Sequence, residues 1–280
     1  MSHPTEVEVQ PASIVSSTSA GDRNFDDLAH RFQRNVYSRL KGMIRLAVLR
    51  RDLHEALPQL PAPAPEGELR IFDAGGGQGP LSLELASQGH HVALCDISAR
   101  MLDLAAQRIA AEGLGDRVTL HHMAIQDFCV RQTEYFDLVL CHAVLEWVAD
   151  PRALLDSLCA VLKPGGLLSL SFYNIHGLAM KNLLRGNFAK VLAEDYRGFR
   201  GSLTPPDPPA PAQVFEWLTA LGLEQVCYSG IRCFHDYLLD PALRESSPEA
   251  QLALELRLSR QEPFRALGRY LHLLVQRPAN

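Results

Sequence analysis

The stretch IFDAGGGQGP, residues 71–80, places an aspartate and four glycines directly after a short apolar run. Glycines between a strand and a helix allow the backbone to approach a ligand closely. A Walker A loop needs Lys-Ser/Thr after its last glycine, but Pro80 and Leu81 follow Gly79, which excludes a phosphate-cradling nucleotide site of that kind. The dinucleotide fingerprint G-x-G-x-x-G also fails, because Pro80 stands at the position of its third glycine.

A second acidic residue, Asp96, ends the next apolar run. An aspartate about 20 residues after the glycine loop, at the carboxyl edge of a sheet, can accept both ribose hydroxyls of a bound nucleoside. Together with the pattern Asp-x-Gly-x-Gly-x-Gly, Asp73 to Gly79, it predicts S-adenosylmethionine, which carries no phosphate, with Gly75 and Gly76 beside its methionyl part. The alternative is a tight strand–helix turn in which Asp96 is a helix-capping acid.

Further polar residues follow the next predicted strands. Ile125 and Gln126 could frame an adenine ring, and Asp127 could accept from its exocyclic amine. His142 and Glu146 come at or after the end of the fourth strand. Ligands of open α/β sheets bind outside the carboxyl ends of the strands, so these positions should converge on one crevice. Without a family for comparison, a structural role for His142 is favoured over that of a catalytic base.

The elements that must position these residues alternate along the chain from Leu69. Near-continuous apolar strands between helices predict a mostly parallel, Rossmann-like sheet of seven strands covered on both faces. The strands are expected at 69–74, 91–96, 117–123, from 136, and at 167–174, 224–234 and 269–278. Helices are expected at 80–89, 98–113, 152–162 and 213–223, with Ser98 and Asp150 as N-caps, Gly113 as terminator, and KPGG (163–166) as a turn.

The sequence divides into three regions. Residues 1–21 are rich in Ser, Thr and Pro and predict a disordered tail. Residues 22–66 predict amphipathic helices followed by a proline-rich linker. Residues 67–280 are expected to form the methyltransferase domain, with mainly helical insertions on the substrate side at about 174–212 and 235–265.

The charge and composition of the chain limit the classes of partner that it can bind. The formal net charge of −5 gives no global attraction to nucleic acid. Residues 22–51 nevertheless contain eight Lys or Arg against three acids, and residues 180–200 contain five against two, so both could line a phosphate-binding rim or simply be solvated faces. No signal peptide and no apolar run of about 18 residues is present, the histidine pairs lack metal-ligand spacing, and the six cysteines form no CxxC pair, which together predict a cytoplasmic protein without a metal.

The chain from Asp22 to about Arg277 resembles the bacterial tRNA 5-carboxymethoxyuridine methyltransferases, a family of class I S-adenosylmethionine-dependent enzymes. The similarity rests on DRNFDDLAHRF, FDAGGGQG, LCDISARML, HAVLEWVADPRALL, LKPGGLLSLSFYNIHGL, GIRCFHDYL and RQEPFRALGRYLHL. It implies a class I methyltransferase fold and methyl esterification of the carboxymethoxy group on the wobble uridine, in the anticodon loop of tRNA. It also implies a cofactor site at Arg45, Gly75, Gly76, Asp96, Ile125, Gln126 and His142, where position 125 can be Ala in the family. The chain departs from the family in its N-terminal tail and in the absence of a lysine run from 181–200.

This reaction limits what the acceptor site must do. A carboxylic acid with a pKa of about 4 is ionised at neutral pH, so the nucleophile needs no general base. The site needs a cation to orient the carboxylate and an aromatic surface for the uracil. The candidates are Arg232, His235, Tyr237 and Tyr173, together with Asn174 and His176. An ordinary polar cluster that closes a subdomain is the alternative interpretation of these residues.

Two other functions remain open at this point. The same scaffold could serve a small-molecule O-, N- or C-methyltransferase whose insertions at 174–212 and 235–265 form a lid. A non-catalytic cofactor-binding protein that acts through partner contacts would be a different class.

Overall fold

The computed structural model describes residues 21–26, 39–60, 67–133, 135–196, 203–205 and 207–279. The predicted disordered tail up to residue 20, part of the predicted N-terminal helices (27–38) and part of the proline-rich linker (61–66) fall outside these residues, as do residues 197–202 of the first insertion.

The described part of the chain contains a seven-stranded sheet with the order β3-β2-β1-β4-β5-β7-β6. Its strands are β1 (Arg70–Ala74), β2 (His91–Asp96), β3 (Val118–His122), β4 (Phe136–His142), β5 (Leu162–Tyr173), β6 (Glu224–Ile231) and β7 (Tyr270–Gln276). The first five strands pair in parallel, whereas β7 runs antiparallel to both β5 and β6. The predicted mostly parallel sheet and class I methyltransferase fold are confirmed.

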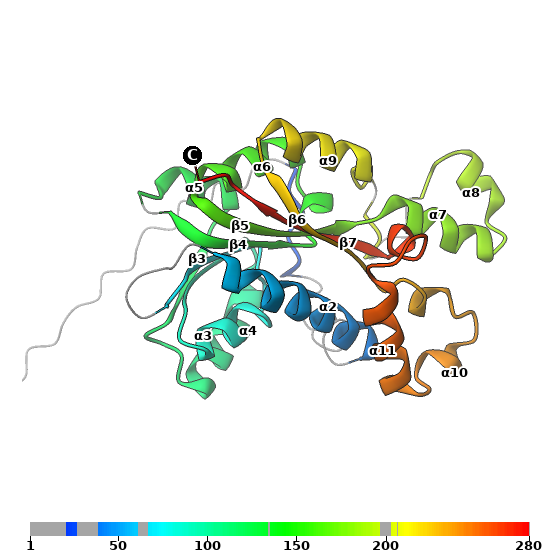
Figure 1. Ribbon diagram of the computed structural model, residues 1–280, viewed down its shortest axis with the longest axis horizontal. Coiled ribbons are helices and arrows are strands. Elements are labelled where there is room, and N and C mark those ends of the chain that lie inside the picture. Colours follow the sequence, from blue (N-terminus) through cyan, green and yellow to red (C-terminus); the bar gives the residue numbers. More distant parts are fainter. Residues whose placement is uncertain are drawn as a thin grey trace, which may run out of the picture.

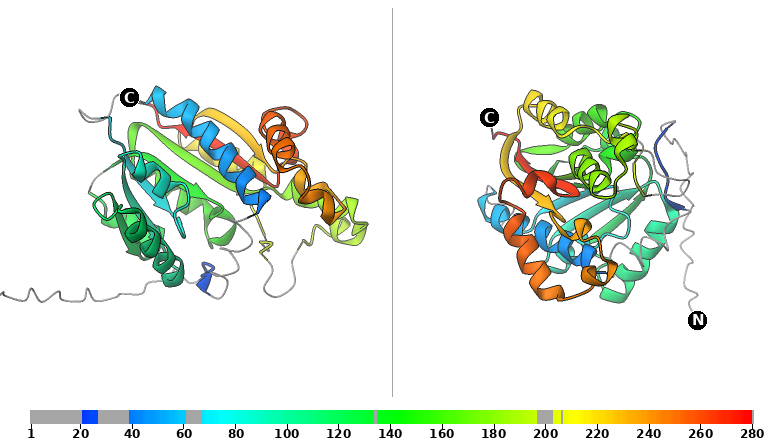
Figure 2. Two further views of the ribbon diagram at one scale, coloured as in Figure 1. Left: turned by 90° about the horizontal axis from the view of Figure 1, so that it is seen from below. Right: turned by 90° about the vertical axis from the view of Figure 1, so that its right-hand side faces the viewer.

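Helices cover both faces of this sheet (Figure 1). One face carries α2 (Leu40–Ala56), α3 (Ser82–Ser87) and α4 (Ala99–Glu112), and the other carries α5 (Ile125–Arg131), α6 (Pro151–Ala160) and α9 (Pro211–Ala220). Figure 2 shows the same three-layered arrangement from two further directions. Each layer therefore has its own apolar core against one side of the sheet.

The register of the central strands explains why their apolar runs are continuous. Ile71 pairs with Leu138, and Phe72 pairs with Val139. The first pair packs into the core beneath α2, α3 and α4, whereas the second packs into the core beneath α5, α6 and α9. Successive side chains of a strand point to opposite faces, so a strand covered on both sides needs apolar residues at every position.

Most of the predicted helix ends are confirmed. The side chain of Ser98 accepts a hydrogen bond from the backbone of Met101, and Gly113 ends α4 with a φ of 69°. Asp150 caps α6 in the same way through the backbone of Ala153. Ser98 and Asp150 thus start α4 and α6 at the carboxyl edge of the sheet, and Gly113 ends α4 at the opposite edge, before β3.

Two predictions about elements were wrong or incomplete. The KPGG segment does not form a turn but belongs to β5, because Gly165 donates its N–H to the carbonyl of Arg277, which follows β7, and accepts from the side chain of Gln276. The seven-residue helix α5 was not predicted, since it spans fewer than two full turns beyond its cap and shows no clear period.

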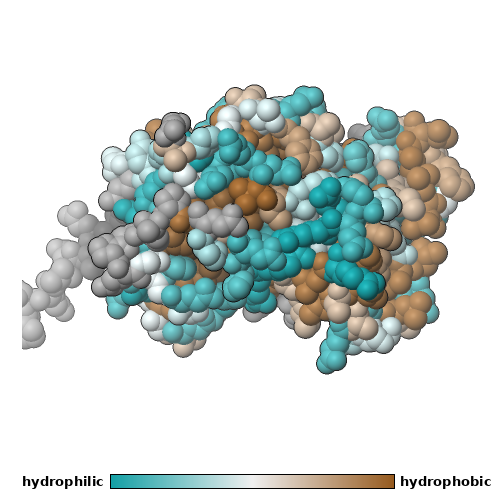
Figure 3. Space-filling view, in the orientation of Figure 1, coloured by the Kyte–Doolittle hydropathy of each residue, from teal (hydrophilic) through white to brown (hydrophobic). Residues whose placement is uncertain are grey.

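The insertions gather at one end of the molecule (Figure 1). After β5 come α7 (Ile175–Leu184) and α8 (Phe188–Leu192); between β6 and β7 come η5 (His235–Tyr237), α10 (Pro241–Arg244), α11 (Pro248–Leu258) and η6 (Arg265–Leu267). Apolar side chains gather on the surface of this end (Figure 3), including Leu183, Leu184, Phe188, Leu192, Leu239 and Leu243. Among the described residues, no helix has the length and apolar character needed to cross a bilayer.

Candidate active site

A pocket lies at the carboxyl ends of β1, β2 and β4, where the sequence predicted ligand binding. The glycine loop after β1, the start of α5, part of α2, residues 22–25 and Leu203 contribute to its wall. All the residues expected to bind a cofactor line it: Arg45, Gly75, Gly76, Asp96, Ile125, Gln126 and His142. The fold thus brings together positions that lie up to 97 residues apart in the chain.

The glycine loop packs too closely for side chains at its first two glycines. Gly75 has a φ of 69°, and a Cβ there would lie 2.6 Å from a methyl group of Val144. A Cβ on Gly76 would clash with the carboxylate of Asp73 below the loop. The N–H groups of both glycines donate to the carbonyl of Cys95 at the end of β2, which fixes the loop against that strand.

Two carboxyl groups lie against this loop, Asp73 buried beneath it and Asp96 half-buried at the pocket wall. Asp96 accepts hydrogen bonds from the backbone N–H of Gly77 at 2.9 Å and of Ser98 at 2.8 Å, one on each oxygen. Asp73 accepts from the hydroxyl of Ser82 at 2.5 Å. Burial raises the pKa of Asp96 to about 6 and that of Asp73 to about 7. Ser98 caps α4, so the alternative role of Asp96 as the helix cap is not seen.

The rest of the pocket lining includes a cation, a histidine and apolar side chains. The guanidinium of Arg45 lies 4.4 Å from the ring centroid of Tyr270. His142 uses Nε2 to contact Ser169 Oγ at 2.8 Å, and burial lowers its pKa well below the usual value, so the ring is neutral. Trp147 stacks edge-on against Phe25 and both line the pocket. The cavity therefore offers apolar surface together with a few charged and polar groups.

Two residues expected in the same crevice lie outside the pocket wall. Asp127 belongs to the first turn of α5 and does not line the cavity. Glu146 is 5% exposed, and neither oxygen of its carboxylate has a hydrogen-bond partner within the described part of the chain. Burial raises the pKa of Glu146 to about 7, so it is partly protonated near neutral pH.

A cluster of cations lies next to the pocket and surrounds one carboxylate. Asp236 Oδ2 lies 3.4 Å from Arg232 Nη2, 3.5 Å from Arg269 Nε and 4.0 Å from Lys181 Nζ. All four side chains are largely buried. Burial and the neighbouring arginines lower the pKa of Lys181 to about 8, even though Asp236 opposes this shift. We call these four residues the cation cluster; it has an excess of positive charge.

Tyr270 connects the cation cluster to the pocket. Its ring lies beneath Arg45 on the pocket side and 5.4 Å from the guanidinium of Arg232 on the cluster side. Tyr173 packs edge-on against it, with ring centroids 5.2 Å apart, and lies beneath Arg269. Tyr173 is only 1% exposed, so it is not the open aromatic surface that the sequence predicted for the uracil.

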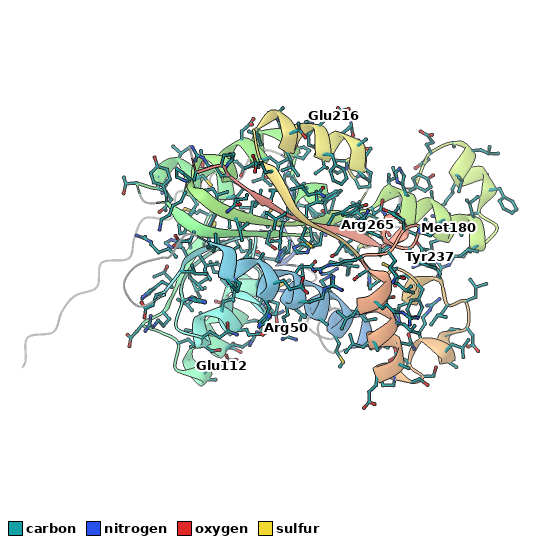
Figure 4. All side chains as sticks on the ribbon, viewed as in Figure 1. Arg50, Glu112, Met180, Glu216, Tyr237 and Arg265 are labelled. Atoms are coloured by element: carbon teal, nitrogen blue, oxygen red, sulfur yellow. The ribbon has the colours of Figure 1, made fainter. Side chains whose placement is uncertain are left out.

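The other candidate acceptor residues are placed around the cation cluster rather than in it. His235 is buried, with its Nδ1 2.9 Å from Gln251 on α11. The hydroxyl of Tyr237, labelled in Figure 4, lies 2.5 Å from the carbonyl of Leu267 and ties α7 to the segment before β7. Asn174 caps α7 and also donates to the carbonyls of residues 266 and 268, whereas His176 is exposed.

Comparison with known proteins gives the family. A methyltransferase domain family matches residues 72–170. The tRNA 5-carboxymethoxyuridine methyltransferase of Escherichia coli (strain K12) is 46% identical over 257 residues, which cover 92% of this chain and 97% of that protein. The chain belongs to the tRNA 5-carboxymethoxyuridine methyltransferase family. It is an S-adenosylmethionine-dependent methyltransferase.

More distantly related proteins share part of the sequence or the fold. A ubiquinone biosynthesis O-methyltransferase of Xylella fastidiosa (strain 9a5c) is 34% identical over 58% of this chain and 64% of its own length. Among solved structures, magnesium protoporphyrin IX methyltransferase from Synechocystis PCC 6803 with bound SAH aligns with a TM-score of 0.58 at 17% identity, covering 90% of this chain and 96% of that one. This last similarity concerns the fold alone.

The pocket of this tRNA 5-carboxymethoxyuridine methyltransferase family member suits the cofactor that the family uses. The closely packed glycines leave a backbone cradle, since side chains at Gly75 and Gly76 would clash. Asp96 presents a carboxylate to this pocket, Arg45 a cation, and Ile125 an apolar side chain. In the described part of the chain, no group of His, Cys, Asp and Glu is arranged to hold a metal ion.

Four residues of this arrangement were not predicted as site residues: Lys181, Asp236, Arg269 and Tyr270. Arg269 and Tyr270 lie in RQEPFRALGRYLHL, which carried the family resemblance but gave no indication of a role. They reach the site because β7 runs antiparallel to β5, so that Tyr270 pairs with Tyr173 at the carboxyl end of β5. Strand direction of this kind is not readable from the local sequence.

Proposed function

We propose that this protein transfers a methyl group from S-adenosylmethionine to the carboxylate of 5-carboxymethoxyuridine at the wobble position of tRNA, giving the methyl ester, and that it acts in the cytoplasm. The observation that carries this proposal is the cation cluster, joined to the cofactor pocket through Tyr270. The name of the Escherichia coli relative points to the same acceptor.

The pocket residues would hold the cofactor in a defined orientation. Asp96 would accept from the ribose hydroxyls, and Ile125 with Gln126 would frame the adenine. Arg45 would pair with the methionyl carboxylate beside the loop of Gly75 and Gly76, with His142 on the same side. When bound, the cofactor supplies a methyl group on a positively charged sulfur.

The cation cluster would orient the acceptor carboxylate. Arg232 Nε and Arg269 Nη1 are buried and have no hydrogen-bond partner among the described residues, so each retains a donor for an anion once the side chains over the cluster move aside. Asp236 already neutralises part of the positive charge, which prevents the cluster from binding a carboxylate too tightly for transfer. We assign Tyr173 to support Arg269, and His235 and Tyr237 to hold the surrounding backbone.

No residue needs to remove a proton. The acceptor carboxylate is already ionised at neutral pH. Its negative charge and the positive sulfonium neutralise one another as the methyl group moves, so water exclusion and geometry should supply most of the acceleration. The neutral state of His142 is consistent with a binding role rather than that of a base.

The acceptor base can reach such a site because a wobble uridine lies in a single-stranded loop. Unpaired bases of this kind can be splayed out without melting a duplex. The insertions at 174–212 and 235–265 would form the tRNA side of the site, and the exposed Arg185, directly after α7, would contact a phosphate.

The direct test is analysis of tRNA nucleosides from a strain lacking this gene. Free 5-carboxymethoxyuridine should accumulate in place of its methyl ester, and the purified protein with S-adenosylmethionine should restore the ester in that tRNA. Labelled methyl incorporated into a metabolite extract but not into tRNA would support the small-molecule alternative. An unchanged ester level, with no turnover of either acceptor, would leave the non-catalytic alternative and contradict the proposal.

The role of Arg232 can be tested separately with Arg232→Gln. Loss of one charge-assisted contact to the acceptor should lower kcat/KM for tRNA by about 10- to 100-fold. The Kd for S-adenosylhomocysteine should stay within about twofold, because Arg232 does not line the cofactor pocket. Arg265→Gln is the matched control, since Arg265 pairs with Glu262 outside the cation cluster. Equal loss of cofactor affinity would place Arg232 on the cofactor side instead.

A further inference from the structure

A continuous chain of buried polar groups runs from the cofactor pocket through the sheet to α2. His142 Nε2 lies 2.8 Å from Ser169 Oγ, which lies 2.9 Å from His272 Nε2. His272 Nδ1 in turn lies 2.8 Å from Asp52 Oδ2. Ser169 and His272 are fully buried and Asp52 is 1% exposed, so no water competes for these contacts.

The far end of this chain has a fixed charge. Asp52 Oδ1 accepts from Arg51 at 2.7 Å and from Arg260 at 2.5 Å, while Oδ2 faces His272. Burial alone would raise the pKa of Asp52, but the hydrogen bond from His272 and the charge of Arg51 hold it well below its usual range. Asp52 is therefore an ionised acceptor, and His272 must donate to it through Nδ1–H.

The proton on His272 Nδ1 determines where the protons of Ser169 and His142 lie. Two guanidinium groups already neutralise Asp52, so a buried imidazolium at His272 would add uncompensated charge. A neutral His272 with its proton on Nδ1 offers a lone pair on Nε2, which accepts the hydroxyl proton of Ser169. The oxygen of Ser169 then accepts from His142 Nε2–H. The remaining nitrogen of His142, Nδ1, carries a lone pair.

We propose that Asp52, His272 and Ser169 are positioning residues that fix the tautomer of His142, so that its Nδ1 is a permanent hydrogen-bond acceptor for the methionyl ammonium of the cofactor. The ammonium is the cationic donor of S-adenosylmethionine on the side where Arg45 would hold the carboxylate. This inference rests on the cofactor placement proposed above. It adds three residues outside the pocket wall to the machinery that binds the methyl donor.

Asp52→Asn should reverse the donor and acceptor in every hydrogen bond of this series, from residue 52 to His142. The amide oxygen of the new side chain would stay with the two arginines on the Oδ1 side, and its NH2 would face His272. His272 would then carry its proton on Nε2, Ser169 would donate to His142 Nε2, and His142 would present Nδ1–H to the ammonium. Two donors would face one another in place of a charge-assisted hydrogen bond.

The first readout is the tautomer in the ligand-free protein. Two-bond ¹H–¹⁵N spectra of histidine-labelled protein, with His142 assigned from a His142→Gln sample, should show the proton on Nε2 in the wild type and on Nδ1 in Asp52→Asn. A wild-type proton on Nδ1 would overturn the inference while leaving the cofactor placement intact.

The second readout is affinity, measured by calorimetry for S-adenosylhomocysteine and for its desamino analogue, which lacks the ammonium. Asp52→Asn should weaken the first by about 10- to 100-fold and leave the second within about twofold. Glu55→Gln is the matched control, because Glu55 binds the same Arg260 from the same helix but does not touch the chain. Both affinities should be unchanged there.

Two results would contradict the inference. Equal weakening of both ligands in Asp52→Asn would show a general structural effect rather than an inverted donor. A Ser169→Ala variant that weakened S-adenosylhomocysteine by the same factor in the wild type and in the Asp52→Asn background would show that the chain does not act as a unit. Unchanged affinity in a His142→Ala variant would instead overturn the cofactor placement on which both proposals depend.

Discussion

Individual carboxyl groups in this site differ in protonation because their surroundings differ. Asp52 and Asp236 lie among arginines, whose charges keep the pKa of each carboxyl well below the usual range despite burial. Asp73 bonds a hydroxyl and Asp96 bonds backbone N–H groups, neither forms an ion pair within the described part of the chain, and burial raises their pKa to about 7 and about 6. The first pair therefore holds fixed charge, and the second pair can titrate near physiological pH.

Asp96 should make cofactor binding depend on pH. Ribose hydroxyls donate to the ionised carboxylate, so binding favours loss of its proton. With a pKa of about 6 in the free protein, affinity for S-adenosylhomocysteine should rise with pH up to about 6 and then level off. Below that point the affinity should fall by up to about tenfold per pH unit. Calorimetric titrations between pH 5 and 8 would measure this profile.

Two variants distinguish the titration of Asp96 from that of Asp73. Asp96→Asn should weaken binding above pH 6 and remove the step, because no group at that position titrates. Asp73→Asn should keep the step, since Asp73 does not contact the ribose side of the pocket but bonds Ser82. A step that persists in Asp96→Asn would assign the titration to another group.

At the scale of elements, the β1–α3 loop is shaped by what lies around it as well as by glycine's backbone freedom. Gly75 and Gly113 have the same φ of 69°, but a Cβ would meet Val144 at the first position and nothing within 4 Å at the second. The two positions therefore separate backbone strain from a clash.

Gly113→Ala should lower the free energy of unfolding by about 1 kcal/mol, the cost of a left-handed residue, and leave cofactor affinity unchanged. Gly75→Ala adds the clash, so it should lower stability further and weaken S-adenosylhomocysteine by at least about tenfold as the loop shifts. Denaturant unfolding and calorimetry would test both. Equal effects of the two substitutions on affinity would mean that the loop is not the cofactor cradle.

The second half of the sheet, β5, β7 and β6, positions the residues of the proposed acceptor site. β5 delivers Tyr173 and α7, and the antiparallel β7 delivers Arg269 and Tyr270 to the same place. Arg232 follows β6, where it adopts a φ of 60° that is uncommon for a residue with a side chain. The methyl donor and the proposed acceptor sites thus come from different halves of one sheet, and Tyr270 lies where they meet.

At the scale of the whole molecule, an acidic protein would have to bind tRNA through local cations. The net charge is −5, yet α7 begins beside the cation cluster and carries Lys181, with exposed Arg185 directly after its last turn. Counterions released from each phosphate contact make such binding dependent on salt.

Arg185→Gln should weaken tRNA binding across salt concentrations and reduce the slope of log K against log[salt] by about 1 if it contacts one phosphate. Arg108→Gln, on α4 at the opposite end of the molecule (Figure 1), should change neither quantity. Filter binding at several salt concentrations would measure both variants. Similar slopes for Arg185→Gln and the wild type would remove α7 from the tRNA interface.

The sequence by itself determined the strand–helix alternation, the glycine loop, Asp96 and the helix caps, because each depends on residues close together in the chain. It also brought Arg232 and Tyr173 forward as acceptor candidates, because the reaction that the family resemblance implies needs a cation and an aromatic surface. Only the tertiary structure decided that β7 runs against β5, that Arg269 and Tyr270 meet Arg232, and that His142 connects to Asp52 through two strands. These contacts join residues as far as 220 positions apart, and their formation depends on strand order and direction, which no local pattern encodes.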